Sequence, residues 1–284
     1  MTRKPVSRSA AAAALGTIAA ALAAPAAHAE WALNMTRGVT TLSDNIYALH
    51  MHVFWWCVGI GVFVFAWMIL SMVRYRKSQG AVPDTKMVHS TKVEIIWTVV
   101  PVIILVVMAI PAARTLVQIE DTSGSTVNIK VTAYQWKWQY EYLESGVSLF
   151  STLARDSDAA RQLGSGTDVT KVENYLLDVD HPLVVPVGTK IRLLITSQDV
   201  IHAWWVPAFA IKKDAIPGFV NEAWFEIQPD KAGVYRGQCA ELCGRDHAFM
   251  PIVVEAKSPE DFKAWIDEHK AQQQASAPAA PGAG

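Results

Sequence analysis

Two long apolar runs in the first half of the chain restrict what it can fold into. The first, Val53 to Val73, holds 21 consecutive residues without a charged side chain, and a second run spans Ile95 to Ala113. A helix of 21 residues is about 31 Å long, which is enough to cross the hydrocarbon core of a bilayer. A pair of buried core helices is the alternative, but two such runs in succession are unusual in soluble domains. We therefore predict a transmembrane hairpin with spans at about residues 50–73 and 95–113.

The loop between these runs indicates how the hairpin is oriented. Its charged residues are almost all basic, and basic loops stay on the cytoplasmic side of a bacterial membrane. Both ends of the hairpin are therefore expected to face outward. Only Asp84 opposes the basic residues, which are Arg74, Arg76, Lys77, Lys86 and Lys92.

The N-terminus has the features of a signal peptide that ends at Ala29. Arg3, Lys4 and Arg8 precede an Ala-rich apolar run, and Ala27-His28-Ala29 fits a small-x-small cleavage site. A transit peptide is the alternative, because Arg and Ser occur here without an acidic residue. With 51% hydrophobic residues overall, only part of the chain can be buried in lipid. We predict a signal peptide at residues 1–29, an N-terminal segment and hairpin at 30–114, and export of the rest across the bacterial inner membrane.

Beyond residue 114 the sequence changes to short segments rich in Val, Ile, Thr and aromatic residues, broken by Gly and Pro. This pattern predicts the strands of a β-sandwich or barrel over residues 115–257. Residues 144–173 read as a surface insertion or long loop, expected to be mobile and dispensable for chemistry. Residues 258–284 read as a short amphipathic helix at Pro259–Lys270 followed by a disordered Ala/Pro/Gln tail at Gln272–Gly284. The segments predicted to be strands include Thr126–Thr132, Tyr175–Val179, Lys190–Thr196 and Pro251–Glu255.

One loop near the C-terminus carries Cys239, Cys243, His247 and Met250, and His202 follows an upstream strand. Two thiolates, two imidazoles and a thioether are soft or borderline ligands, which suit copper better than Mg²⁺ or Ca²⁺. A mononuclear blue-copper site needs one Cys, so a second Cys at this spacing favours two copper ions bridged by both sulfurs.

Two other uses of this cysteine pair stay open on the sequence alone. Cys2His2 is a structural zinc set, although the usual spacings are shorter and a thioether adds nothing to it. A disulfide between Cys239 and Cys243 is possible in an oxidising compartment. Cys57 lies inside the first apolar run and is expected to be an inert packing residue.

The residues resemble a family, subunit 2 of haem-copper cytochrome c oxidases of the bacterial aa3 type, which carries the binuclear CuA centre. The resemblance runs from the hairpin to about Trp265. It implies a two-helix transmembrane hairpin followed by an all-β cupredoxin-like sandwich or barrel. The motifs that carry it are Val93-Glu94-Ile-Ile-Trp97, Gln135-Trp136-Lys-Trp138-Gln-Tyr140-Glu141, His202-Ala-Trp-Trp-Val-Pro207, Lys213-Asp214-Ala-Ile-Pro217-Gly218 and Gly237 to Met250.

The resemblance also implies roles for single residues. Glu241 would offer its backbone carbonyl to copper and its side chain to a magnesium ion at the interface with the catalytic subunit. Trp136 would be the aromatic side chain through which an electron arrives, and Glu94 would mark the entrance of a proton channel. A solvated loop acid, a core aromatic and a boundary carboxylate are the plain alternatives. The implied CuA ligands are His202, Cys239, Glu241, Cys243, His247 and Met250.

The implied function is to accept electrons from cytochrome c and pass them to haem in subunit 1, where oxygen is reduced to water with proton translocation. Subunit 3 is a further expected partner, and no nucleic acid is expected. The donor should be a separate protein, because no Cys-x-x-Cys-His is present to hold haem covalently. The alternative is a membrane-tethered copper-delivery protein. A quinol-oxidase subunit would lack the full ligand set, and the chain has no room for the catalytic half of a nitrous oxide reductase.

Charge favours a basic donor, although one residue departs from the family pattern. Residues 115–284 carry 15 Lys and Arg against 22 Asp and Glu, a net charge of −7, which favours a basic partner. Lys137 stands where the family often has an aromatic residue and puts a positive charge beside the expected docking face. The candidate docking acids are Glu141, Asp178, Asp180 and Asp199.

Overall fold

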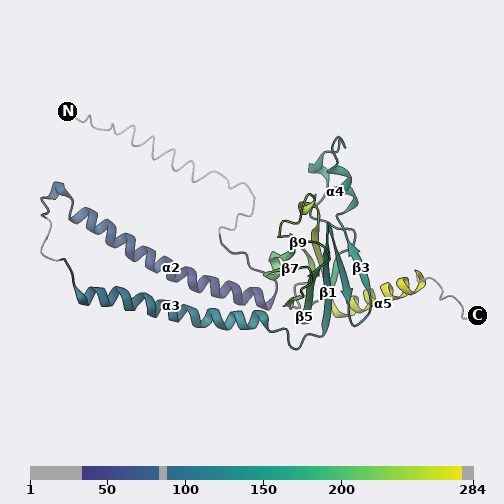
Figure 1. The fold of residues 1–284 in the computed structure, drawn as a ribbon, viewed down its shortest axis with the longest axis horizontal. Helices are drawn as coiled ribbons and strands as arrows, with labels where there is room; N and C mark the ends of the chain where they lie inside the picture. The colour runs from purple at the N-terminus through teal and green to yellow at the C-terminus, as the bar shows by residue number, and fades with distance from the viewer. Residues whose placement is uncertain (1–33, 83–87, 277–284) are drawn as a thin grey trace, which may run out of the picture. The chain divides into compact units, whose positions relative to one another are not determined.

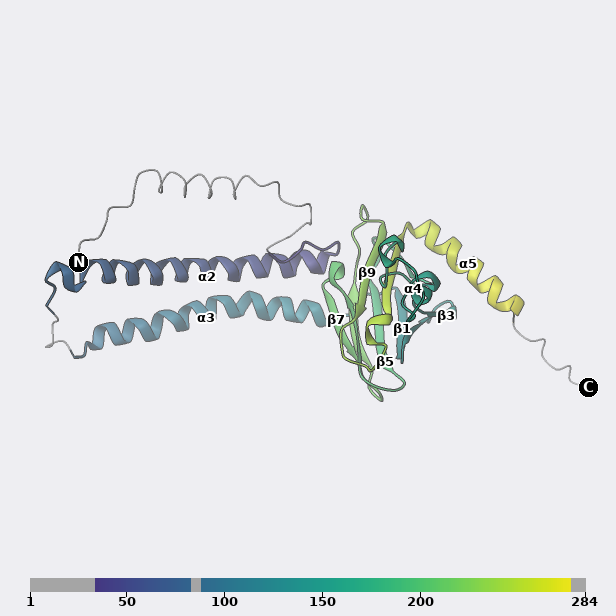
Figure 2. The same ribbon diagram turned by 90° about the horizontal axis from the view of Figure 1, so that it is seen from above.

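The computed structural model describes residues 34–82 and 88–276. The predicted signal peptide and the last part of the predicted tail, residues 277–284, lie outside the described residues. The first described helices are α2 (Thr41–Arg74) and α3 (Thr91–Glu120), which lie side by side in Figures 1 and 2. They are antiparallel, since the Asn45 amide near the start of α2 lies 3.5 Å from the Gln118 amide oxygen near the end of α3.

Both helices are long and apolar enough to cross a membrane, and the most apolar window of each is unburied within this chain. This confirms the predicted pair of apolar helices, although each is longer than its apolar run. The start of α2 is fixed by a reciprocal cap: the Ser43 N–H donates to the Thr40 hydroxyl at 3.0 Å, and the Thr40 N–H donates to the Ser43 hydroxyl at 3.1 Å. Pro101 and Pro111 lie inside α3 without ending it.

The β-domain contains two five-stranded sheets, which confirms the predicted all-β sandwich. Each sheet holds one parallel pair, β1 with β5 and β4 with β10, among antiparallel neighbours. In spatial order the first sheet is β3 (Ser148–Ser151), β2 (Lys137–Tyr142), β1 (Val127–Tyr134), β5 (Ile191–Ser197) and β8 (Asn221–Phe225). The second is β4 (Leu183–Pro186), β10 (Pro251–Lys257), β9 (Gly233–Cys239), β6 (His202–Val206) and β7 (Ile211–Ala215).

The core of the domain is aromatic. Strand β2 alternates half-buried and buried residues, and its buried members are Trp138, Tyr140 and Tyr142. The rings of Phe209 and Phe225 stack with centroids 4.7 Å apart. Cys239, Cys243 and Met250 belong to the same buried cluster. The candidate ligand loop is therefore anchored in the core.

Two predicted segments differ from the structure. Residues 144–173 are not one long loop: β3 pairs with β2, helix α4 spans Arg155–Ala160, and a 3-10 turn spans Val169–Lys171. Tyr175–Val179 is wrong as a strand, because Tyr175, Leu176 and Leu177 form a turn and only Val179 makes an isolated antiparallel bridge, to Leu153. Asn174 and Leu176 have positive φ angles of 47° and 62°, which an extended strand excludes.

The C-terminal helix is longer than predicted. Helix α5 spans Pro259–Ser276, so it takes in the first residues of the segment that we predicted as a disordered tail. Its Trp265 and Phe262 rings pack against Tyr142, with centroids 5.4 and 6.2 Å away. This contact covers the edge of the core with an amphipathic helix.

Tyr142 links the two sheets through its hydroxyl. That hydroxyl donates to the Val184 carbonyl at 2.8 Å and accepts from the Val184 N–H at 3.0 Å, so it replaces a strand partner for the edge strand β4. Burial raises the pKa of Tyr142, which stays neutral.

Tyr142→Phe leaves both Val184 backbone groups unpaired and is expected to destabilise the domain by about 1–3 kcal/mol. Thermal unfolding of the detergent-solubilised chain measures this loss. Tyr134→Phe, whose hydroxyl bonds a half-exposed Gln139, is the control, and equal melting temperatures for the two variants would contradict the prediction.

Candidate metal centre

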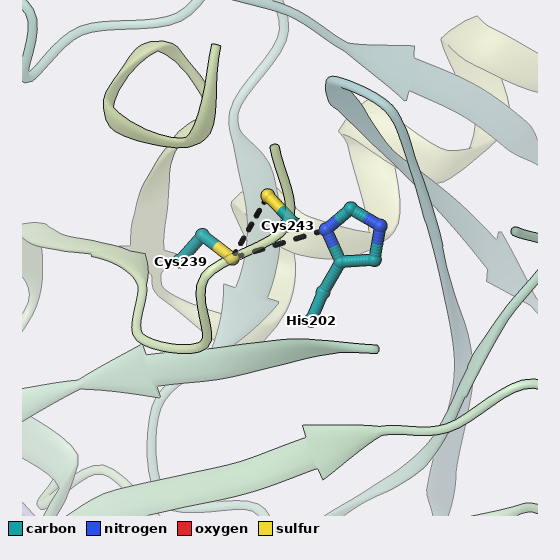
Figure 3. Close-up of side chains that lie close together, drawn as sticks. All are labelled: His202, Cys239 and Cys243. Atoms are coloured by element: carbon teal, nitrogen blue, oxygen red, sulfur yellow. Dashed lines mark hydrogen bonds between the residues drawn. The ribbon is translucent and has the colours of Figure 1, made fainter. Parts of the chain in front are cut away.

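The ends of neighbouring strands bring the candidate ligands together. Strand β9 ends at Cys239, strand β6 begins at His202, and the two strands pair through Trp204 and Cys239. The chain then runs through a loop to the 3-10 turn His247–Phe249, and Met250 immediately precedes β10. Figure 3 shows the Cys239 and Cys243 sulfurs directed toward each other, with the His202 ring beside them.

All six predicted ligands contribute an atom to one cluster. Cys239 Sγ lies 3.9 Å from both His202 Nδ1 and Cys243 Sγ, and 3.4 Å from the Glu241 carbonyl oxygen. Cys243 Sγ lies 3.4 Å from His247 Nδ1 and 3.6 Å from Met250 Sδ. The two cysteines are free thiols in the structure. The atoms thus form a continuous set of sulfur, nitrogen and carbonyl donors around the cysteine pair.

The donor set fits copper. The His202, Cys239, Cys243 and Met250 side chains are 0 to 5% exposed, so soft donors gather where little water reaches them. Thiolate and thioether sulfur with imidazole is the ligand chemistry that copper prefers, and a Met sulfur adds nothing to a structural zinc site. Burial, followed by the neighbouring Cys239, raises the pKa of Cys243 to about 12. The thiol is therefore protonated at neutral pH unless a cation stabilises the thiolate.

Asp199 fixes the orientation of the His202 ring. Its carboxylate lies 2.9 Å from His202 Nε2, on the opposite side of the ring from the Nδ1 atom that faces Cys239. A proton on Nε2 that is donated to Asp199 leaves the Nδ1 lone pair available for a metal. Burial alone raises the pKa of Asp199, but hydrogen bonds from His202, Val200 N–H and Gln135 N–H hold it below its usual value. The sequence predicts Asp199 only as a docking acid, so this second role is new in the structure, and its spacing of three residues from His202 is the one local feature that fits it.

Trp136 contacts the candidate ligand loop directly. Its indole N–H donates to the Cys243 carbonyl at 3.3 Å, and the Gln135 amide donates to the same oxygen at 2.8 Å. Gly244 allows this approach, because a Cβ atom there would lie 3.2 Å from the Trp136 ring at a φ of +118°. On the other side of the loop, the Trp138 indole donates to the Met250 carbonyl at 3.2 Å.

The Glu94, Glu241 and Lys137 side chains take no part in the donor cluster. Glu94 is in the first turn of α3, where its carboxylate accepts from the Ser90 N–H at 3.1 Å and lies 3.0 Å from His89 Nδ1. The Glu241 residue is exposed although its carbonyl faces Cys239. The Lys137 ammonium lies over the Phe150 ring, 4.4 Å from its centroid.

The candidate docking acids other than Asp199 also have partners within the domain. Glu141 pairs with Lys130 at 2.8 Å, Asp178 lies 3.8 Å from Arg236, and Asp180 accepts from the Thr152 hydroxyl at 2.8 Å. Glu141 and Asp178 are thus paired with basic side chains of the same domain, and Asp180 is held by a hydroxyl.

Comparison with known proteins gives matches along most of the chain. Residues 28–114 match the model of the cytochrome c oxidase subunit II transmembrane domain, and residues 127–257 match that of its periplasmic domain. The mitochondrial cytochrome c oxidase subunit 2 of Glycine max is 39% identical over 83% of this chain and 58% of its own length. The probable cytochrome c oxidase subunit 2 of Rickettsia prowazekii is 39% identical over 83% of this chain and 72% of its own length.

A solved structure also matches. The periplasmic domain of subunit II of cytochrome oxidase from Bradyrhizobium japonicum is 39% identical, with a TM-score of 0.46, over 53% of this chain and 98% of that domain. The chain spans less than two thirds of the length of two plant mitochondrial relatives. It covers 58% of the Glycine max protein and 61% of the Vigna unguiculata protein.

Proposed function

The chain belongs to the cytochrome c oxidase subunit II family, and we propose from this membership that it accepts electrons from cytochrome c within a respiratory oxidase. The observation that carries the proposal is the convergence of four donor groups, from His202, Glu241, His247 and Met250, on one cysteine pair. Family and site agree on an oxidoreductase component held in the membrane by two apolar helices. A copper-delivery protein is not favoured, because the family is one of oxidase subunits and four of the six donor residues are buried.

The proposed cofactor is a binuclear copper centre, CuA, held by His202, Cys239, Glu241, Cys243, His247 and Met250. When bound, it supplies a one-electron couple whose charge is shared between two metal ions. The protein residues hold the donors and exclude water. Strand ends position His202 and Cys239, Asp199 orients the imidazole, and the aromatic core surrounds the sulfurs. Donors held this firmly need little rearrangement when the charge of the site changes.

Trp136 is the proposed point at which an electron reaches the domain. Its ring is half-buried, and one hydrogen bond separates its indole nitrogen from the carbonyl of the proposed ligand Cys243. An electron accepted at this ring has a short route to a ligand residue. The net charge of −7 over residues 115–284 favours a basic donor such as cytochrome c.

The wider assembly is also part of the proposal. The β-domain would lie on the periplasmic side of the bacterial inner membrane, because the basic loop between the helices favours the cytoplasm. Subunit 1, with subunit 3, would receive the electron at haem and reduce oxygen to water with proton translocation. Glu94 would mark the entrance of a proton channel. The exposed Glu241 carboxylate would contribute to a magnesium site shared with subunit 1.

Trp136→Phe tests the proposed electron route. The variant removes the indole N–H while the Gln135 amide keeps its bond to the Cys243 carbonyl. We expect copper content to be retained and the rate of electron transfer from reduced cytochrome c to fall by roughly tenfold or more. Stopped-flow oxidation of cytochrome c by the assembled oxidase measures this rate. Trp205→Phe, on β6, is the control, and an unchanged rate in Trp136→Phe would rule out this route.

A further inference from the structure

The segment at residues 148–180, which includes most of the insertion predicted at residues 144–173, contacts the ligand loop. Its two ends are joined, since the Thr152 N–H and hydroxyl donate to the Asp180 carboxylate at 2.7 and 2.8 Å. Helix α4 is held within it by the buried Ser157, whose hydroxyl accepts from the Leu176 N–H at 3.1 Å. The segment thus offers a fixed base for any side chain that reaches out of it.

Arg161, at the end of α4, is the side chain that extends from this segment to the ligand loop. Its Nε atom donates to the Asp158 carboxylate at 2.7 Å, which holds the guanidinium in place. The Nη1 atom lies 3.7 Å from the Asp246 carboxylate, and Cζ lies 4.2 Å from the centre of the Phe249 ring. The Arg161 and Asp246 side chains are only 22% and 15% exposed, so solvent screens their attraction less than it would on an open surface.

These two contacts bracket proposed copper ligands. Asp246 and Phe249 lie on either side of His247, and Met250 follows Phe249. Asp246 precedes the 3-10 turn that carries His247, and its carbonyl accepts from the Phe249 N–H at 2.9 Å. A shift of Asp246 or Phe249 therefore moves the His247 and Met250 donors.

Between α4 and the ligand loop, the contact is made by the Arg161 guanidinium across an open space. A cavity of about 180 Å³ lies between α4 and the ligand loop, lined by Trp136, Leu153, Arg161, Asp246 and Phe249 among others. With this space beside the loop, the guanidinium is the group that spans from the segment to both Asp246 and Phe249.

We propose that Arg161 is a positioning residue that holds the His247–Met250 half of the ligand loop, so that the segment at residues 148–180 stabilises the metal centre. This inference rests on the proposed copper-binding function. Arginine suits the role because its planar fork can pair with Asp158 and Asp246 while its face stacks on Phe249. A lysine at this position would supply the charge without the fork or the planar face.

The test uses the full chain in detergent, as wild type, Arg161→Ala, Arg161→Lys and Arg155→Ala. Arg155 is an exposed arginine of the same helix and provides the matched loss of charge. Three quantities are measured: amide hydrogen exchange of residues 245–250 without copper, copper loss to a chelator, and the reduction potential of the copper-loaded chain. We expect Arg161→Ala to raise exchange and speed copper loss about fivefold, with a lower reduction potential. Arg161→Lys should recover part of each effect, and Arg155→Ala should match wild type.

The outcomes separate the two claims. The positioning role is wrong if Arg161→Ala and Arg155→Ala have the same amide hydrogen exchange, the same rate of copper loss and the same reduction potential. The proposed copper function would still stand in that case. If Arg161→Ala does not fold, Arg161→Lys decides by the same criteria. A wild-type chain that binds no copper overturns the proposed function and this inference together, and it is recognised from the copper content of the wild-type sample alone.

Discussion

Cys243→Ser is expected to abolish the near-infrared absorption of the copper-loaded chain while the helical hairpin still inserts into membranes. Cys243 Sγ lies within 3.9 Å of three candidate donor atoms, which are Cys239 Sγ, His247 Nδ1 and Met250 Sδ. A serine hydroxyl is a hard donor that does not replace a bridging thiolate. Absorption spectra of the solubilised chain, together with membrane fractionation, measure both halves of this expectation.

Cys57→Ser is the matched control for that experiment. Cys57 lies in α2 and has no place in the donor cluster, so its loss should leave the copper spectrum unchanged. Near-infrared absorption that survives in Cys243→Ser would mean that the metal binds elsewhere in the chain.

Asp199→Ala should lower copper affinity by roughly 10–100-fold. The change removes the acceptor for His202 Nε2, so the imidazole loses the partner that sets its orientation and directs its Nδ1 atom at the cysteines. The carboxylate also accepts from the Gln135 N–H at 2.7 Å, so the variant loosens the backbone next to Trp136. Competition with a copper chelator of known affinity measures the loss.

Asp230→Ala is the control for Asp199, because its carboxylate is 73% exposed and pairs only with its neighbour Lys231 among the contacts described. An affinity in Asp199→Ala that equals the control would show that the His202 ring is held in place without the carboxylate.

The hairpin and the ligand loop could be predicted because their signals are local. A run of 21 uncharged residues is long enough to span a bilayer whatever surrounds it. Cys239, Cys243, His247 and Met250 stand within twelve residues, so their chemistry could be read as a unit. His202 lies 37 residues before Cys239, and no local pattern places the two side by side; the pairing of β6 with β9 within one sheet provides that contact.

Other features depend on contacts that no local pattern specifies. The hydrogen bond between His202 Nε2 and Asp199 forms in the turn between β5 and β6, and the spacing of three residues alone does not distinguish it from a surface charge. The ends of the segment at residues 148–180 are joined by Thr152 and Asp180, which are 28 residues apart. Tyr175–Val179 has the composition of a strand, but positive φ at Leu176 breaks it. Composition alone did not distinguish these cases.

The most direct test of the account is the electron paramagnetic resonance spectrum of the full chain loaded with copper and analysed for metal content. A cysteine-bridged pair predicts two copper ions per chain and one unpaired electron coupled to both nuclei, which gives a multi-line spectrum. One copper per chain with a spectrum from a single nucleus would contradict it, as would a disulfide between Cys239 and Cys243 in freshly isolated, active protein.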